Sequence, residues 1–159
     1  MKAILRYLRF ILPHLGIVSI VLAMVLGCFY NWRGKAVLLT TDKTNVFITK
    51  NKEIKITPYA LTLANFKADF YNSGEPKSLE AFIKVEENNE IKTILLRVNH
   101  PCRMGFGQNL YLTNYAQHSE NPELCVVELV YDPFQGLFLS GIILVITNLC
   151  YLCAKKRII

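Results

Sequence analysis

The sequence predicts a membrane protein in which two transmembrane α-helices flank a mainly β extracytoplasmic domain. Two apolar runs, residues 10–30 and 134–153, each approach the roughly 20 residues that a helix needs to cross about 30 Å of hydrocarbon. Between these runs, apolar and polar residues alternate in short segments, as they do in strands. The prediction therefore divides the chain into a cytoplasmic tail (1–9), a first span (10–30), an extracytoplasmic domain (31–133), a second span (134–153) and a cytoplasmic tail (154–159).

The distribution of charge predicts the orientation of the chain. The formal net charge is +6, and the cations that produce it lie in the two tails: Lys2, Arg6, Arg9, Lys155, Lys156 and Arg157. Because Lys and Arg are retained on the cytoplasmic side, we expect a multi-pass protein of the bacterial inner membrane with both termini in the cytoplasm. The segment between the spans is neutral. This excludes nucleic acid as a partner, since such binding needs a basic patch on the folded part.

The first span has two features besides its length. It closes in Tyr30, with Trp32 just beyond, and amphipathic rings of this kind favour the headgroup level. Small residues recur along one side of the predicted helix, at Gly16, Ser19, Ala23 and Gly27. Such a stripe lets helices pack closely in lipid. The partner is either the second span or a larger bundle of another protein.

The residues Val25-Leu26-Gly27-Cys28 resemble a bacterial lipoprotein cleavage box behind a basic and then an apolar segment. Leu26 fits that box poorly, and the apolar run continues past the cysteine. A retained helix is therefore predicted, with cleavage before Cys28 as the alternative.

The second span begins with a start signal and ends in a cysteine pair. Asp132 is predicted to be the N-cap, followed by Pro133 at a position where its missing N–H costs nothing. Gly136 and Ser140 form a weaker small-residue pair. Cys150 and Cys153 are separated by two residues, but one such pair gives only half a zinc site, so we interpret both, like Cys28, as small apolar packing residues.

The outer domain is expected to be β-rich. Residues 46–49 and 53–57 are short strand-like runs, and residues 124–131 form a later run that leads into the second span. Residues 79–87 and 90–98 alternate around Asn88-Asn89, a pair that tolerates the left-handed turn of a two-residue hairpin. Around residues 59–71, helical and strand periodicity compete.

The search for catalytic motifs points away from an autonomous enzyme. The sequence has no Gly-rich phosphate loop, no His-Glu-x-x-His, no Gly-x-Ser-x-Gly and no zinc quartet. We therefore assign no catalytic residues and no metal site. At most, the chain is one subunit of an enzyme.

The middle of the chain contains a series of short motifs: Phe66-Lys-Ala-Asp-Phe-Tyr71, Gly74-Glu-Pro76 with a strand through Val85, Val98-Asn99-His100-Pro101, then Gly105 or Gly107, and Tyr111. In order and spacing this series resembles the ResB family of system II cytochrome c biogenesis proteins. Asp132-Pro133 entering a span with Gly136 and Gly141 is similar to the last span of that family. The resemblance covers about residues 54–153. Members of the family usually have four spans, whereas two are predicted here, and Cys102 stands where leucine is common.

The resemblance implies a function. Proteins of this family act with a CcsA-type membrane subunit, and together they carry haem across the membrane and attach it to apocytochrome c. This chain would then be a component of a system II haem lyase that assists haem delivery, with haem as a transient cofactor and the bilayer, the CcsA-type subunit and apocytochrome c as partners. The alternative is a non-catalytic envelope protein whose β domain scaffolds a membrane complex.

Two histidines are the candidate haem ligands, because neutral imidazole is the usual protein ligand of haem iron. His14 lies near the start of the first span and opposite the small-residue stripe, where it either ligates haem or reaches headgroup water. His100 lies in the family-like motif, beside Pro101, where it either contacts haem or apocytochrome or is simply solvated. His118, in a polar loop, is a weaker candidate.

Two cysteines lie in the outer domain. If that compartment oxidises thiols, a disulfide between Cys102 and Cys125 would close a loop and stabilise the domain by roughly 3 kcal/mol.

Overall fold

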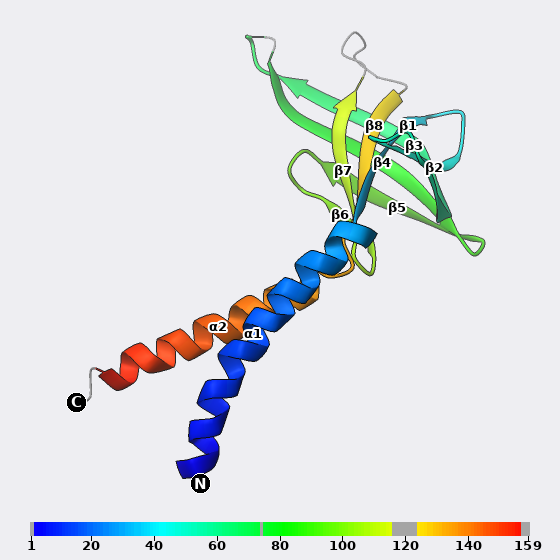
Figure 1. The fold of residues 1–159 in the computed structure, drawn as a ribbon. Coiled ribbons are helices and arrows are strands. Elements are labelled where there is room, and N and C mark those ends of the chain that lie inside the picture. The colour runs from blue at the N-terminus through cyan, green and yellow to red at the C-terminus, as the bar shows by residue number, and fades with distance from the viewer. Residues whose placement is uncertain (1, 74, 116–123, 157–159) are drawn as a thin grey trace. The chain divides into compact units, whose positions relative to one another are not determined.

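The computed structural model describes the backbone of residues 2–73, 75–115 and 124–156, and the side chains of residues 10–73, 75–115 and 124–153. The chain divides into two compact units (Figure 1). The helix unit consists of residues 1–31 and 132–159, and the β unit spans Trp32–Tyr131. Two apolar helices flanking an antiparallel β domain agree with the predicted fold class.

The helix unit contains α1 (Lys2–Tyr30) and α2 (Gln135–Lys156). Their apolar parts, Phe10–Tyr30 and Gln135–Cys153, are long enough to cross a membrane, and most of their side chains are not buried within the protein. Helices that are apolar on every side need an apolar environment. These features indicate membrane association.

The two helices pack on each other through glycine. A Cβ added to Gly16 would lie 2.8 Å from the carbonyl oxygen of Gly141, and one added to Gly141 would lie 2.7 Å from that of Gly16. Gly16 and Ala23 are buried, so the predicted stripe does face the other helix. The second span meets it with Gly141 rather than Gly136, where an added Cβ would have no neighbour within 4 Å.

The start of α2 confirms the predicted capping. The backbone N–H of Phe134 donates to Oδ1 of Asp132 over 3.2 Å, as expected of an N-cap side chain. The capping carboxylate satisfies an amide that lacks a partner within the helix.

The β unit is an eight-stranded antiparallel sheet in the described residues. Its strands are β1 (Trp32–Leu39), β2 (Thr44–Thr49), β3 (Ile54–Phe70), β4 (Pro76–Glu87), β5 (Glu90–Arg97), β6 (Cys102–Gly105), β7 (Gln108–Tyr115) and β8 (Leu124–Tyr131). The spatial order is β5-β4-β3-β2-β1-β8-β7-β6. Neighbours in this order are also neighbours in the chain, except that β8 pairs with β1.

This order is that of an up-and-down barrel whose ladder is interrupted between β5 and β6. The sheet nevertheless curves round, because β5 also contacts β6 and β7. The pairing of β1 with β8 brings together the two ends of the unit, since Trp32 lies opposite Tyr131. The chain therefore enters and leaves the barrel at neighbouring positions of the same end.

The barrel interior is filled by alternate side chains of these strands. The fully buried ones include Leu38, Phe47, Leu61, Leu63, Phe66, Ile83, Leu96, Leu110, Cys125, Val127 and Leu129. Phe66 also stacks on Tyr115 with ring centroids 5.3 Å apart. Gly34 is required where β1 crosses β2, because an added Cβ would lie 2.9 Å from Cβ of Phe47.

Several predicted elements can be compared with this barrel. The hairpin around Asn88-Asn89 is confirmed: β4 pairs with β5, and the two asparagines have φ values of 50° and 66°. Residues 46–49, 53–57 and 124–131 fall mainly within β2, β3 and β8. The helical alternative for residues 59–71 is wrong, since β3 runs through Phe70. The strands β1, β6 and β7 were not predicted from the sequence.

Candidate functional site

The outer surface of the barrel carries a group of exposed β-branched residues, which we call the apolar face: Val37, Val46, Ile48, Ile54 and Ile56. Across β2 and β3, Val46 lies opposite Ile56 and Ile48 opposite Ile54. On β1, Lys35 lies opposite Ile48, and Val37, two residues further along, is on the same outer side of the sheet. Ile54 and Ile56 are 66% and 71% exposed. Contiguous apolar side chains of this kind mark an interaction surface.

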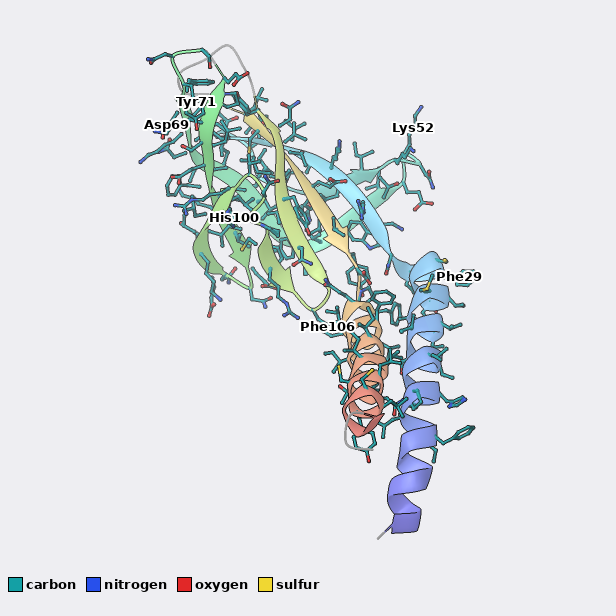
Figure 2. The ribbon with its side chains drawn as sticks, turned by 90° about the vertical axis from the view of Figure 1, so that its left-hand side faces the viewer. Phe29, Lys52, Asp69, Tyr71, His100 and Phe106 are labelled. Atoms are coloured by element: carbon teal, nitrogen blue, oxygen red, sulfur yellow. The ribbon has the colours of Figure 1, made fainter. Side chains whose placement is uncertain are left out.

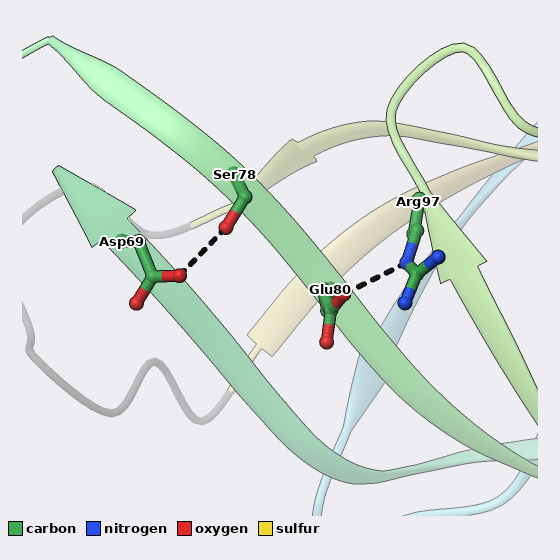
Figure 3. A network of polar contacts seen from close by, with 4 residues as sticks. All are labelled: Asp69, Ser78, Glu80 and Arg97. Atoms are coloured by element: carbon green, nitrogen blue, oxygen red, sulfur yellow. Dashed lines mark hydrogen bonds and ion pairs between the residues drawn. The ribbon is translucent and has the colours of Figure 1, made fainter.

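A second part of the outer surface is polar, and we call it the polar face: Lys67, Asp69, Ser78, Glu80 and Arg97, on β3, β4 and β5. Nε of Arg97 donates to Oε1 of Glu80 over 2.7 Å, and the Ser78 hydroxyl donates to Oδ2 of Asp69 over 2.8 Å (Figure 3). Lys67 places its ammonium 5.5 Å from the ring centroid of Phe82. Here the surface groups bind one another.

His14 lies on the exposed side of α1, away from the Gly16 face. Its Nδ1 is 2.6 Å from the carbonyl oxygen of Phe10, and its ring lies 4.3 Å from the ring of Phe10. A carbonyl accepts only from a protonated nitrogen, so Nδ1 carries a proton in this contact, and in the neutral ring the lone pair is then on Nε2. Histidines that ligate metals commonly have such a hydrogen bond on the other nitrogen.

His100 follows β5 in a turn on the barrel. Its backbone N–H donates to the carbonyl of Arg97 over 3.1 Å, and Asn99 takes a positive φ of 63° in the middle of that turn. The imidazole is exposed (Figure 2). His14 and His100 belong to different units, and His118 lies outside the described residues.

A cavity of about 420 Å³ opens in the helix unit, where α1 ends and α2 begins. The residues that line it are Ala23, Met24, Gly27, Cys28, Asn31, Asp132, Phe134, Gln135 and Phe138. This volume falls in the range of small-ligand sites. The sequence did not predict the cavity, although Ala23 and Gly27, whose small size leaves room for it, belong to the predicted packing stripe of the first span.

The chain belongs to the ResB-like family. The sequence profile of that family matches residues 1–135, which include α1, the whole β unit and the Asp132-Pro133 start of α2. The resemblance seen in the sequence is thus confirmed, and the match extends further toward the N-terminus and ends earlier than the stretch 54–153. A comparison with curated proteins finds no match. Membership of this family indicates a role in cytochrome c biogenesis.

The two cysteines of the barrel do not form the expected disulfide, since both thiols are free. Cys102 lies opposite Leu110, which lies opposite Leu129, four residues along β8 from Cys125. Two strand spacings and four residues separate the two α-carbons by on the order of 15 Å, whereas a disulfide requires less than about 7 Å. Cys125, on β8, is fully buried in the barrel interior, and burial raises the pKa of its thiol to about 12.

The barrel interior is polar near the end at which the chain enters and leaves. The Tyr59 hydroxyl donates to Oε1 of Gln108 over 2.8 Å, linking β3 with β7. The Thr57 hydroxyl donates to the carbonyl of Tyr59, also over 2.8 Å. Burial, and then the charge of Glu87, raise the pKa of Tyr59 above its ordinary value. Tyr59 therefore stays neutral and acts as a structural donor.

The other sulfur atoms add no metal centre in the part of the chain that the structure describes. Within those residues, no group of three His, Cys, Asp or Glu side chains is placed to hold a metal ion. Cys28, Cys150 and Cys153 are free and exposed on the helices. All three lie on outer helix surfaces or at the cavity, so they do not pack between α1 and α2. Their interpretation as small apolar packing residues stays a prediction for the surface that meets lipid or a partner.

Proposed function

We propose that this chain is a component of a system II cytochrome c biogenesis complex and assists haem delivery and attachment to apocytochrome c. The observation that carries the proposal is membership of the ResB-like family over residues 1–135. The fold supports it, since an outer barrel with an exposed apolar face is joined to two apolar helices. The chain acts as a subunit and is not a haem lyase alone.

In this proposal both helices cross the bacterial inner membrane, with both termini in the cytoplasm and the barrel outside. The tails carry the net positive charge of the chain, which favours this orientation. Most side chains of Phe10–Tyr30 and Gln135–Cys153 are unburied and apolar. Lipid or the helices of a CcsA-type subunit would cover them.

The apolar face of the barrel is the proposed binding surface for a protein partner. Its isoleucines are far more exposed than inward residues of the same strands, such as Phe47 at 0%. Burial of such side chains contributes about 25 cal/mol per Å² of apolar surface. A CcsA-type subunit or apocytochrome c with an apolar counterpart would cover this face.

The helix unit has two candidate places at which haem, as the cargo, would bind. His14, near the cytoplasmic end of the span, offers the lone pair of Nε2 because Nδ1 is engaged by Phe10. The cavity at the other end offers Met24 and Cys28, and sulfur and imidazole side chains are axial ligands of haem iron. The helix pair thus has candidate ligands near both ends of its apolar length.

Deletion of the gene followed by complementation tests the proposed function. Loss of haem-stained c-type cytochromes, restored by this chain, is the expected result. Normal cytochromes after deletion would defeat the proposal and favour a scaffolding protein. Copurification of a CcsA-type subunit would test the partner.

The haem sites of the helix unit are tested by His14→Ala and Met24→Leu, with Thr93→Ala, an exposed barrel residue, as the control. His100→Ala is measured beside them, because His100 is the candidate ligand on the barrel. Visible spectra of the purified complex should show less retained haem in the two helix variants. Unchanged spectra in both would remove the two ligand assignments and leave the assembly role standing.

A further inference from the structure

One row of outward residues crosses four strands at the end of the barrel where the chain enters and leaves. Arg33 of β1 lies opposite Val130 of β8, Val130 lies opposite Asn109 of β7, and Asn109 lies opposite Arg103 of β6. We call these residues the rim. Arg33 and Arg103 are exposed. Neither arginine takes part in an ion pair with an acidic side chain that the structure describes.

The turn between β6 and β7 extends beyond the rim. Gln108 is opposite Tyr131, so the preceding Phe106-Gly107 lies past the last paired residue of β8. Gly107 has a φ of 67°, the left-handed conformation that this tight turn needs. Phe106 is 74% exposed, and Figure 2 shows its side chain at the tip of the turn. A phenyl ring so exposed on a loop tip lacks the apolar contact that would stabilise it there.

The covalent chain keeps one part of the barrel end, Trp32 and Tyr131, near the ends of the apolar helices. A single residue, Asn31, separates α1 from β1, and residues 132–134 separate β8 from α2. Because a residue spans at most about 3.6 Å, these links hold Trp32 and Tyr131 within roughly 7 to 14 Å of the helices. If the helices cross the bilayer, which is part of the proposed function, Trp32 and Tyr131 lie near the headgroups together with the adjoining rim residues Arg33 and Val130.

We propose that this end of the barrel docks onto the phospholipid surface. The ring of Phe106 enters the interface between headgroups and acyl chains, where aromatic side chains are favoured. The guanidinium groups of Arg33 and Arg103 donate to lipid phosphates, whose oxygens match the planar fork of donors. Nε of Arg103 is 3.4 Å from the carbonyl oxygen of Gly105, so this side chain lies over the same turn. A lipid surface is a better candidate for this site than a protein partner, because the two links from the barrel to the apolar helices adjoin the rim.

Single-tryptophan variants of the full chain in vesicles test the docking. Trp32→Phe removes the only tryptophan, and a reporter is then added by Phe106→Trp. Phe70→Trp, at the opposite end of the barrel and 46% exposed, is the matched aromatic control. Leu22→Trp reports on α1. Vesicles of phosphatidylcholine and phosphatidylglycerol are prepared with ordinary or brominated acyl chains, which quench tryptophan on contact.

Brominated lipid should reduce the emission of the reporters at positions 106 and 22 and leave position 70 unchanged. Full emission at 106 with quenching at 22 would overturn the docking and leave the membrane-spanning helices intact. Full emission at both would overturn the docking together with the spans. Haem staining of c-type cytochromes in cells that carry Phe106→Asp reads the proposed function separately.

The arginines are tested by adding Arg33→Gln and Arg103→Gln to the Phe106→Trp reporter. Lipid quenching should fall and quenching by aqueous iodide should rise. Unchanged quenching would overturn the phosphate contacts. Each reporter is also measured with Trp32 retained, as the difference from the parent chain, so that no result depends on the Trp32→Phe background.

Discussion

The apolar face and the polar face lie on the same outer surface of one sheet, and a single strand serves both. β3 presents Ile54 and Ile56 near its start and Lys67 and Asp69 near its end. On the polar face, charged groups find partners on β4 and β5. On the apolar face, the exposed groups are aliphatic.

The two faces differ in their outward side chains only, because the inward side chains beneath both faces are apolar and buried. Phe47 and Leu61 are buried near the apolar face, and Phe66 and Ile83 are buried near the polar face. The interior pattern is what the barrel needs in order to fold. The outer pattern is not needed for the fold, so the apolar face is where a binding function is expected.

The largest expected effect contrasts two adjacent residues of β2. Phe47 points inward and is 0% exposed, whereas Ile48 points outward and is 56% exposed. Phe47→Ala should lower the free energy of unfolding by about 3 to 5 kcal/mol, because it removes a core ring and leaves a cavity. Ile48→Ala should change it by less than about 1 kcal/mol. Denaturant titration followed by Trp32 fluorescence measures both, and equal losses would contradict the assignment of the two faces.

The next effect concerns binding. Replacing Ile54 and Ile56 together by Glu should weaken association with the partner by about 2 kcal/mol or more, since exposed aliphatic anchors then become charges. The free energy of unfolding should stay within about 1 kcal/mol of the parent. Copurification with the CcsA-type subunit and with apocytochrome c measures the loss.

The matched control for that variant is Thr62→Glu with Thr93→Glu. Both threonines flank Lys84 on the polar side of the sheet, and the change again replaces two β-branched residues by two carboxylates. Binding should be unaffected. Equal loss in the two double variants would show that added negative charge, and not the apolar face, controls association.

Local signals in the sequence predicted local structure well. The hairpin of β4 and β5 followed from an alternating pattern around Asn88-Asn89, and the capping of α2 followed from Asp132. Both depend on residues close together in the chain. The small-residue stripe of α1 also predicted its packing face, because helical periodicity alone brings Gly16 and Ala23 to one side.

Contacts distant in sequence were not predictable in the same way. β1 carries Arg33 and Lys35 directly after a span, and its strand character becomes clear only through pairing with β8, far along the chain. β6 has four residues, too few for a periodic pattern. The register of β6, β7 and β8 separates Cys102 from Cys125, and no spacing along the sequence contains that register. The rim depends on the same long-range pairing.

A third test uses pH to examine the barrel interior beneath the apolar face. Cys125 lies opposite Leu38 inside the barrel, and its pKa of about 12 exceeds the ordinary value of 9.0. The folded state therefore favours the neutral thiol. The stability that the buried, neutral thiol contributes is complete below pH 9. As the pH rises from 9 toward 12, the free energy of unfolding falls by up to about 1.4 kcal/mol per pH unit.

The comparison chain for this test is Cys125→Val, which keeps an apolar side chain and removes the titrating group. The difference in unfolding free energy between the two chains should stay constant below pH 9 and change steadily above it. Lys and Tyr residues titrate in both chains, so their effects cancel in the difference. A constant difference up to pH 11 would contradict the burial of the thiol.

The smallest expected effect belongs to the polar face. Glu80→Gln removes the charge that faces Arg97, whose side chain is 54% exposed while that of Glu80 is 25% exposed. The expected loss of unfolding free energy is about 0.2 to 1 kcal/mol at low salt. In 1 M salt, where the screening length is about 3 Å, the loss should become smaller. The control is Glu90→Gln, because the Glu90–Lys92 pair is 72% and 74% exposed and should contribute nothing measurable. A loss at Glu80 that persisted in high salt would mean that this carboxylate acts through packing, and the polar face would then resemble the core more than a solvated surface.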